Sequence, residues 1–95
     1  MTPRRRLRVV FFGTPDFAVP ALDALLRSRH HVVGVVSQPD RPRGRGQKVG
    51  AAPVKHRALE ASCPVLQPAR LKDEAFLASL AALDADLGVV AAYGR

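Results

Sequence analysis

The fold of this chain is constrained most by four short apolar runs that alternate with segments of helical periodicity. The runs cover residues 7–12, 31–37, 64–66 and 87–92, and their lengths suit strands better than helices. Their side chains are apolar with little polar alternation, which is typical of strands covered on both faces. Strands that alternate with helices form parallel sheets with right-handed crossovers. We therefore predict an α/β fold with a doubly wound parallel sheet.

Helices are predicted in the intervals between the apolar runs. Thr14 and Pro15 are typical of a helix start, since a hydroxyl suits the N-cap and proline suits the first helical position. We expect this helix to end near Arg29 and a second helix to cover residues 53–62. Asp73 and Glu74 favour the start of a third helix, because carboxylates interact well with the positive end of a helix dipole. The apolar stripe of the first helix is expected to contain Phe17, Ala21, Leu22, Leu25 and Leu26.

Residues 38–52 form a long segment rich in proline, glycine and basic residues. Because proline and glycine interrupt it repeatedly, we expect a loop without a regular helix or strand. Loops of this length in compact α/β domains tend to serve a function. The loop carries several basic side chains able to bind phosphates: Arg41, Arg43, Arg45 and Lys48. The alternative is a run of solvated charges, which is the common role of exposed arginines.

The net charge of +7 is unevenly distributed along the chain. Residues 1–57 hold twelve basic and three acidic residues, whereas residues 58–95 hold three basic and five acidic residues. Such polarity favours a nucleic acid as partner, and solubility alone is the alternative. The apolar stretch after the basic tail at residues 1–6 is too short for a secretory signal, and no run approaches the length of a membrane helix. We therefore expect a cytoplasmic protein that does not enter a membrane.

Side chains that commonly carry catalysis or metals are sparse. A single cysteine, Cys63, excludes an intrachain disulfide and is expected to be a buried small hydrophobe. No carboxylate or cysteine completes a metal site around the three histidines, so no metal is predicted. Asp84 and Asp86 are expected to be solvated turn residues. The sequence shows no catalytic constellation of its own.

A short motif follows the first apolar run at residues 13–17. It lacks the glycine pattern of dinucleotide sites and the lysine of a P-loop. Its backbone N–H groups can still hold a small anionic group, and the alternative is a capped helix without a ligand. Ligands of open α/β sheets bind at the carboxyl ends of the strands. This motif, residues 37–38 and residues 92–94 all occupy such ends, so we expect the functional site there.

Four segments of the chain resemble the N-terminal part of the methionyl-tRNA formyltransferase family: residues 8–22, 38–48, 53–55 and 89–94. The resemblance implies a Rossmann-like catalytic domain, incomplete in this chain (residues 1–95), which a β-rich C-terminal domain follows in the family. It also implies transfer of a formyl group from 10-formyltetrahydrofolate to the α-amino group of the methionine on initiator tRNA. The whole enzyme is expected to be a monomer without a metal.

The resemblance also implies roles for three sets of residues. The loop at residues 38–52 corresponds to the family's loop that enters the acceptor-stem end of the tRNA. Arg45 matches the arginine most closely tied to that recognition, and Arg41, Arg43 and Lys48 match phosphate contacts. The turn near the aminoacyl end contains Gly13, Thr14, Pro15, Asp16 and Phe17. The border of the folate pocket contains Ala92, Tyr93 and Gly94.

The catalytic residues of the family are an Asn, a His two residues later and a more distant Asp, and they lie downstream of the motif at residues 93–94. No residue of this chain matches them, so we predict that this fragment alone does not transfer formyl groups. Two alternatives stay open. One is a non-catalytic RNA-binding remnant. The other is a folate-dependent formyltransferase for another amine, which the basic loop disfavours.

Overall fold

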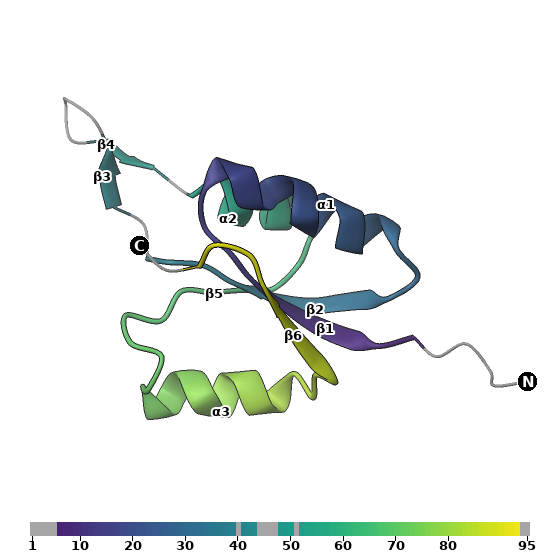
Figure 1. Ribbon diagram of the computed structural model, residues 1–95. Coiled ribbons are helices and arrows are strands. Elements are labelled where there is room, and N and C mark those ends of the chain that lie inside the picture. Colours follow the sequence, from purple (N-terminus) through teal and green to yellow (C-terminus); the bar gives the residue numbers. More distant parts are fainter. Residues whose placement is uncertain (1–5, 40, 44–47, 51, 94–95) are drawn as a thin grey trace, which may run out of the picture.

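The computed structural model describes residues 6–39, 41–43, 48–50 and 52–93, and Figure 1 traces them. In chain order the elements are β1 (Arg8–Phe12), the 3-10 helix η1 (Asp16–Ala18), α1 (Val19–Arg27), β2 (His31–Val36), β3 (Arg41–Arg43), β4 (Lys48–Gly50), α2 (Pro53–Glu60), β5 (Val65–Leu66), α3 (Glu74–Ala82) and β6 (Leu87–Val90). The elements follow the order expected from the apolar runs, with β3 and β4 in addition.

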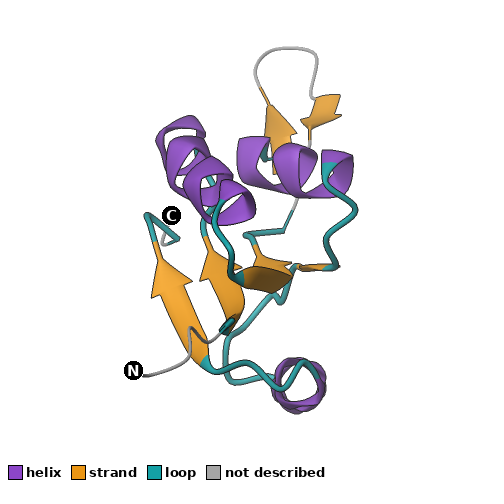
Figure 2. Cartoon of the chain, turned by 90° about the vertical axis from the view of Figure 1, so that its right-hand side faces the viewer, coloured by secondary structure: helices purple, strands orange, loops and turns teal. Residues whose placement is uncertain are grey.

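Strands β1, β2, β5 and β6 form one parallel sheet in the order β5-β2-β1-β6. β1 lies inside the sheet, where Phe11 pairs with Val35 of β2 on one side and with Val89 of β6 on the other. Figures 1 and 2 show α1 and α2 on one face of the sheet and α3 on the opposite face. The crossovers therefore use both faces, and the predicted doubly wound α/β fold is confirmed.

The two faces of the sheet carry separate hydrophobic clusters, because successive strand residues point in opposite directions. Phe11, Leu22 and Val54 are fully buried in the cluster beneath α1 and α2. Val10 and Val36 pack with Phe76 of α3 on the other face. Burial of one such side chain stabilises the fold by about 2 kcal/mol. The strands are thus fixed from both faces, and the residues that follow them start from a rigid support.

The first helix does not begin as the sequence predicted. η1 covers Asp16–Ala18, and α1 starts at Val19 without a side-chain hydrogen bond at its N-cap. Pro20 lies in the first turn of α1, where its missing N–H leaves no helical bond unmade. The prediction of Thr14 as the N-cap is wrong, because the Thr14 hydroxyl bonds to two distant segments of the chain.

The prediction that Phe17 belongs to the apolar stripe of the helix is also wrong, since 76% of its surface is exposed. Phe17 lies in η1, and a 3-10 turn has about 3.0 residues per turn instead of about 3.6, so its side chain leaves the backbone in another direction. Leu22 is completely buried, as predicted. α1 ends at Arg27, where the Ser28 hydroxyl and N–H both donate to the Leu25 carbonyl, at 2.7 and 3.1 Å.

Strands β3 and β4 contradict the expectation that residues 38–52 lack regular structure. They pair antiparallel, with Arg41 opposite Gly50, Pro42 opposite Val49 and Arg43 opposite Lys48. A two-stranded ribbon has no central strand, so the missing N–H of a proline can face away from the partner strand. Figure 1 shows this ribbon projecting beyond the sheet, at the end where α1 begins. Residues 44–47, which include Arg45, lie outside the described residues.

Asp86 is exposed in the bend before β6, as expected of a solvated turn residue, and it also joins the beginnings of β1 and β6. Its carboxylate accepts a hydrogen bond from the Arg8 N–H at 2.8 Å, and its own N–H donates to the Arg8 carbonyl at 2.7 Å. The Arg8 side chain donates through Nε to the carbonyl of Asp84 at 2.9 Å. Asp84 has a left-handed φ of 52°, which turns the chain from α3 toward β6.

The edge strand β6 leaves apolar side chains exposed. β6 lies at one edge of the sheet, and Leu87 and Val90 expose 46% and 68% of their surfaces there. Open sheet edges of this kind tend to pair with further strands.

Over the described ranges, no helix combines the length and the apolar character that a bilayer crossing requires.

Candidate functional site

The carboxyl ends of β1, β2 and β6 meet at one edge of the sheet. Backbone hydrogen bonds continue the pairing past the strands. The Gly13 N–H donates to the Val36 carbonyl at 3.0 Å, and the Ala91 N–H donates to the Phe12 carbonyl at 2.9 Å. The turn at residues 13–17, the start of the basic loop and the strand end at residues 91–93 are thereby brought together. Gly94 lies outside the described residues.

The Thr14 hydroxyl connects these three segments. It donates to the Tyr93 carbonyl at 3.3 Å and accepts the Gln38 N–H at 3.2 Å. The Gln38 side chain closes the triangle, because its Nε2 donates to the same Tyr93 carbonyl at 3.2 Å. All three groups are partly buried, so water competes less for these bonds than at an open surface. We call Thr14, Gln38 and Tyr93 the edge triangle.

The sequence predicted Gln38 at a strand end of the site, whereas Gln67 was not singled out. Gln38 takes part in the edge triangle, and Gln67 Nε2 donates to the Gln38 carbonyl at 3.1 Å. Gln38 closely follows β2, and Gln67 directly follows β5. A polar side chain immediately after a buried strand was the available signal, since such positions in parallel sheets lie at the ligand-binding edge.

Gly13 is required by the close approach of two strand ends. A Cβ atom at this position would lie 2.6 Å from Cε2 of Phe11 and 3.1 Å from the Ala91 carbonyl oxygen. The first distance is far below a normal carbon–carbon contact. A side chain at residue 13 would therefore collide with the Phe11 ring and crowd the end of the strand next to β1.

The strand end after β6 holds an unusual backbone conformation. Ala92 has a left-handed φ of 59°, which costs a residue with a Cβ about 1–2 kcal/mol. The Tyr93 ring then packs edge-on against Phe12, with ring centroids 5.9 Å apart and planes at 85°. Burial raises the pKa of Tyr93, so its hydroxyl keeps its proton at neutral pH. Strained residues persist where neighbours fix them, and such places are often ligand sites.

A family model described as "Formyl transferase" matches residues 6–95, which is nearly the whole chain. The chain belongs to the formyl transferase family. Its four-stranded parallel sheet is the Rossmann-like sheet that the sequence resemblance implied.

Curated relatives of this formyl transferase chain carry the name "Methionyl-tRNA formyltransferase". The chain is 58% identical over 88 residues to the protein from Methylobacillus flagellatus, 54% over 89 residues to that from Moorella thermoacetica, and 51% over 90 residues to that from Sulfurihydrogenibium sp.. These alignments cover 93–94% of the chain and 29% of each relative. The chain thus spans less than a third of the length of these relatives.

Three of the predicted phosphate-binding residues of the formyl transferase chain lie on the β3–β4 ribbon. Arg41 and Arg43 belong to β3, and Lys48 belongs to β4 directly opposite Arg43. Gln38 of the edge triangle lies before β3. Where the chain returns to the domain, the Val54 N–H donates to the Thr14 carbonyl at 3.3 Å. Thr14 therefore forms hydrogen bonds with the chain at both ends of the basic segment, residues 38–52.

The remaining turn residues present different chemistry at the same edge. Pro15 is half-buried, whereas Asp16 and Phe17 are exposed. An exposed carboxylate beside an exposed ring can contact a ligand that carries both an amine and an apolar group. Within the described ranges, no three His, Cys, Asp or Glu side chains lie close enough together to hold a metal ion.

Proposed function

We propose that this chain is the N-terminal part of the catalytic domain of a methionyl-tRNA formyltransferase. The full-length protein transfers a formyl group from 10-formyltetrahydrofolate to the α-amino group of methionine on initiator tRNA. The observation that carries the proposal is the 51–58% identity to relatives of that name along 93–94% of the chain. The proposal includes a monomeric enzyme that acts in the cytoplasm, where translation begins.

The basic ribbon and the residues between its strands bind the acceptor end of the tRNA. Arg41, Arg43 and Lys48 contact phosphates, and Arg45 recognises the end of the stem. Support comes from the concentration of basic residues on a ribbon that projects from the domain (Figure 1). Cationic side chains bind the RNA backbone by releasing its counterions, so this contact weakens as the salt concentration rises.

The edge triangle connects the residues that we place near the tRNA with those that we place beside the folate donor. Gly13, Thr14, Pro15, Asp16 and Phe17 lie near the aminoacyl end, and Ala92, Tyr93 and Gly94 border the folate pocket. Thr14 Oγ1 bonds to Gln38, where the basic segment begins, and to Tyr93. The Tyr93 ring packs edge-on against Phe12, which fixes the strand end whose backbone borders the folate pocket. Bound folate supplies the formyl group, and these residues orient donor and acceptor.

The catalytic groups are supplied by another part of the full-length protein. In the family an Asn, a His and an Asp provide general acid–base catalysis and electrostatic stabilisation, and they follow the motif that matches residues 93–94. The 95 residues of this chain contribute binding and positioning. We expect them to give no turnover when tested alone.

Steady-state formylation by the full-length protein tests the proposal. Arg45→Gln should raise the KM for methionyl initiator tRNA by about tenfold, because one charge-assisted contact is worth about 1.5–3 kcal/mol. The KM for the folate donor should stay unchanged. Arg27→Gln removes the same charge from an exposed position at the end of α1 and is the matched control.

Each unexpected result of these assays would support a different conclusion. Absence of formylmethionyl-tRNA with the full-length protein refutes the proposed activity. Salt-sensitive tRNA binding without turnover would support a non-catalytic RNA-binding protein. Preference for a free amine over aminoacyl-tRNA would support a formyltransferase for another amine. Formylation by the isolated chain above background would contradict the placement of the catalytic groups.

A further inference from the structure

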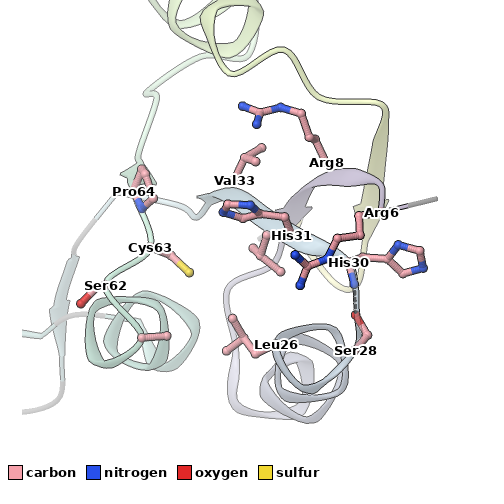
Figure 3. Close-up of a pocket in the computed structure, with 12 residues that line it drawn as sticks. Arg6, Arg8, Leu26, Ser28, His30, His31, Val33, Ser62, Cys63 and Pro64 are labelled. Atoms are coloured by element: carbon pink, nitrogen blue, oxygen red, sulfur yellow. Dashed lines mark hydrogen bonds between the residues drawn. The ribbon is translucent and has the colours of Figure 1, made fainter. Parts of the chain in front are cut away.

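A cavity lies at the opposite end of the sheet from the edge triangle. It is bounded by the amino-terminal ends of β1 and β2 and by the turn before β5 (Figure 3). Its volume of about 580 Å³ falls in the range of small-molecule sites. β2 alone is six residues long, which separates the two ends of the sheet by about 20 Å. The cavity is therefore distinct from the site assigned to tRNA and folate.

The polar lining of this cavity is basic. Arg6, Arg8, His30 and His31 line it, and no Asp or Glu of the described residues does. Figure 3 shows the Arg6 guanidinium, the His31 imidazole and the Cys63 thiol directed toward a common space. A group of cationic and N–H-bearing side chains around one hollow attracts anions in preference to other ligands.

Backbone carbonyls hold the two arginines in fixed positions. Arg6 Nε donates to the Arg29 carbonyl at 2.8 Å. Arg8 donates through Nε and Nη2 to the Leu83 carbonyl, at 3.2 and 2.6 Å, and through Nε to the Asp84 carbonyl. A guanidinium carries more N–H donors than the single bond of Arg6 uses, so both Nη groups of Arg6 remain for a ligand. This side chain is thus positioned in advance.

The other two basic side chains, Arg8 and His30, are less available to bind an anion. The Arg8 guanidinium is already bonded to the Leu83 and Asp84 carbonyls. His30 Nδ1 accepts the Leu7 N–H at 3.0 Å, and Figure 3 shows its ring turned away from the space. Arg6 and His31 therefore carry the attraction for an anion. Apolar side chains of Leu26, Val33 and Pro64 form the remaining wall.

We propose that this cavity binds a phosphate-bearing small molecule of mononucleotide or sugar-phosphate size. The phosphate lies on the Nη groups of Arg6 and on the imidazole of His31, because a guanidinium forks onto phosphate oxygens. The apolar wall contacts the uncharged body of the ligand.

A titration followed by NMR tests this site without tRNA or folate. The 15N-labelled full-length protein is titrated with inorganic pyrophosphate and, separately, with adenosine monophosphate. Saturable shifts of the Val33 and Cys63 amides are expected with both probes. Arg6→Gln should weaken binding about tenfold, because it removes a charge-assisted contact. Arg27→Gln should change it less than about twofold, because Arg27 is exposed and lies outside the lining.

A second variant keeps the test decisive if Arg6→Gln damages the fold. His31→Gln changes an exposed residue at the start of β2, and it should weaken binding while the unfolding midpoint without ligand stays unchanged. Absence of a saturable shift with both probes overturns the proposal. Equal weakening by Arg6→Gln and Arg27→Gln, or shifts confined to residues 38–52, also overturns it.

Discussion

Replacement of Thr14 by valine tests the central connection of the site. Valine has nearly the shape of threonine, so the packing around residue 14 is kept while the hydroxyl is lost. The change removes the donor to the Tyr93 carbonyl and the acceptor of the Gln38 N–H. The Gln38 N–H is partly buried and then has no acceptor at this position. The bond from Gln38 Nε2 to Tyr93 is untouched.

The size of the effect follows from the geometry. The two bonds are 3.3 and 3.2 Å long, at the weak end of the normal range, and a neutral hydrogen bond contributes about 1 kcal/mol net. Loss of both should therefore destabilise this edge by about 1–2 kcal/mol. Since 1.4 kcal/mol corresponds to a tenfold change, local opening should become about 5–30 times more frequent.

Native-state hydrogen exchange of the Gln38 amide measures that opening directly. The Thr14→Val form of the full-length protein should exchange this amide about 5–30 times faster than the parent, while amides of β1 keep their protection. Thr14→Ser retains the hydroxyl and is the matched control, with exchange close to that of the parent. If Thr14→Val and Thr14→Ser exchange the Gln38 amide at the same rate, the hydroxyl does not fix the start of the basic segment.

Two further predictions concern residues at or near the sheet. Gly13→Ala should lower the free energy of unfolding by about 1–3 kcal/mol in urea titrations, because the new Cβ meets Phe11 at 2.6 Å. Gly88→Ala is the control, since its nearest atom would be 3.5 Å away; equal losses for both would refute the steric reasoning. Burial, opposed by the charge of Arg57, raises the pKa of the Cys63 thiol above 9.0, so alkylation by iodoacetamide should be slower than for an unfolded peptide at pH 8. The unfolded chain loses this proton first, so the free energy of unfolding should fall as pH rises above 9.0; an unchanged alkylation rate on folding would contradict the prediction.

The strands and helices could be predicted because their signals are local. Continuous apolar runs such as residues 31–37 need burial on both faces, and only a sheet with helices on each side provides it. The same property places the ligand edge at Gly13, Gln38 and Tyr93, since parallel strands all end on one side. The predicted contacts of these residues with tRNA and folate stay predictions.

The errors arose where distant partners override local rules. Thr14 matches the pattern of an N-cap, but its hydroxyl bonds to groups 24 and 79 residues away in the sequence. The β3–β4 ribbon was missed because proline and glycine lower strand propensity, while an antiparallel partner at short range restores it.

The position of β1 between β2 and β6 has a consequence for biosynthesis. β2 is complete at Val36, but the other neighbour of β1 is complete only at Val90. At a synthesis rate of about 5–20 residues per second, the ribosome needs about 3–11 seconds to make the residues between these two points. During that interval one side of β1 has no partner strand, and unpaired strand edges are sites of association between chains. Until β6 has been made, the nascent protein therefore needs protection from the nascent chains on neighbouring ribosomes.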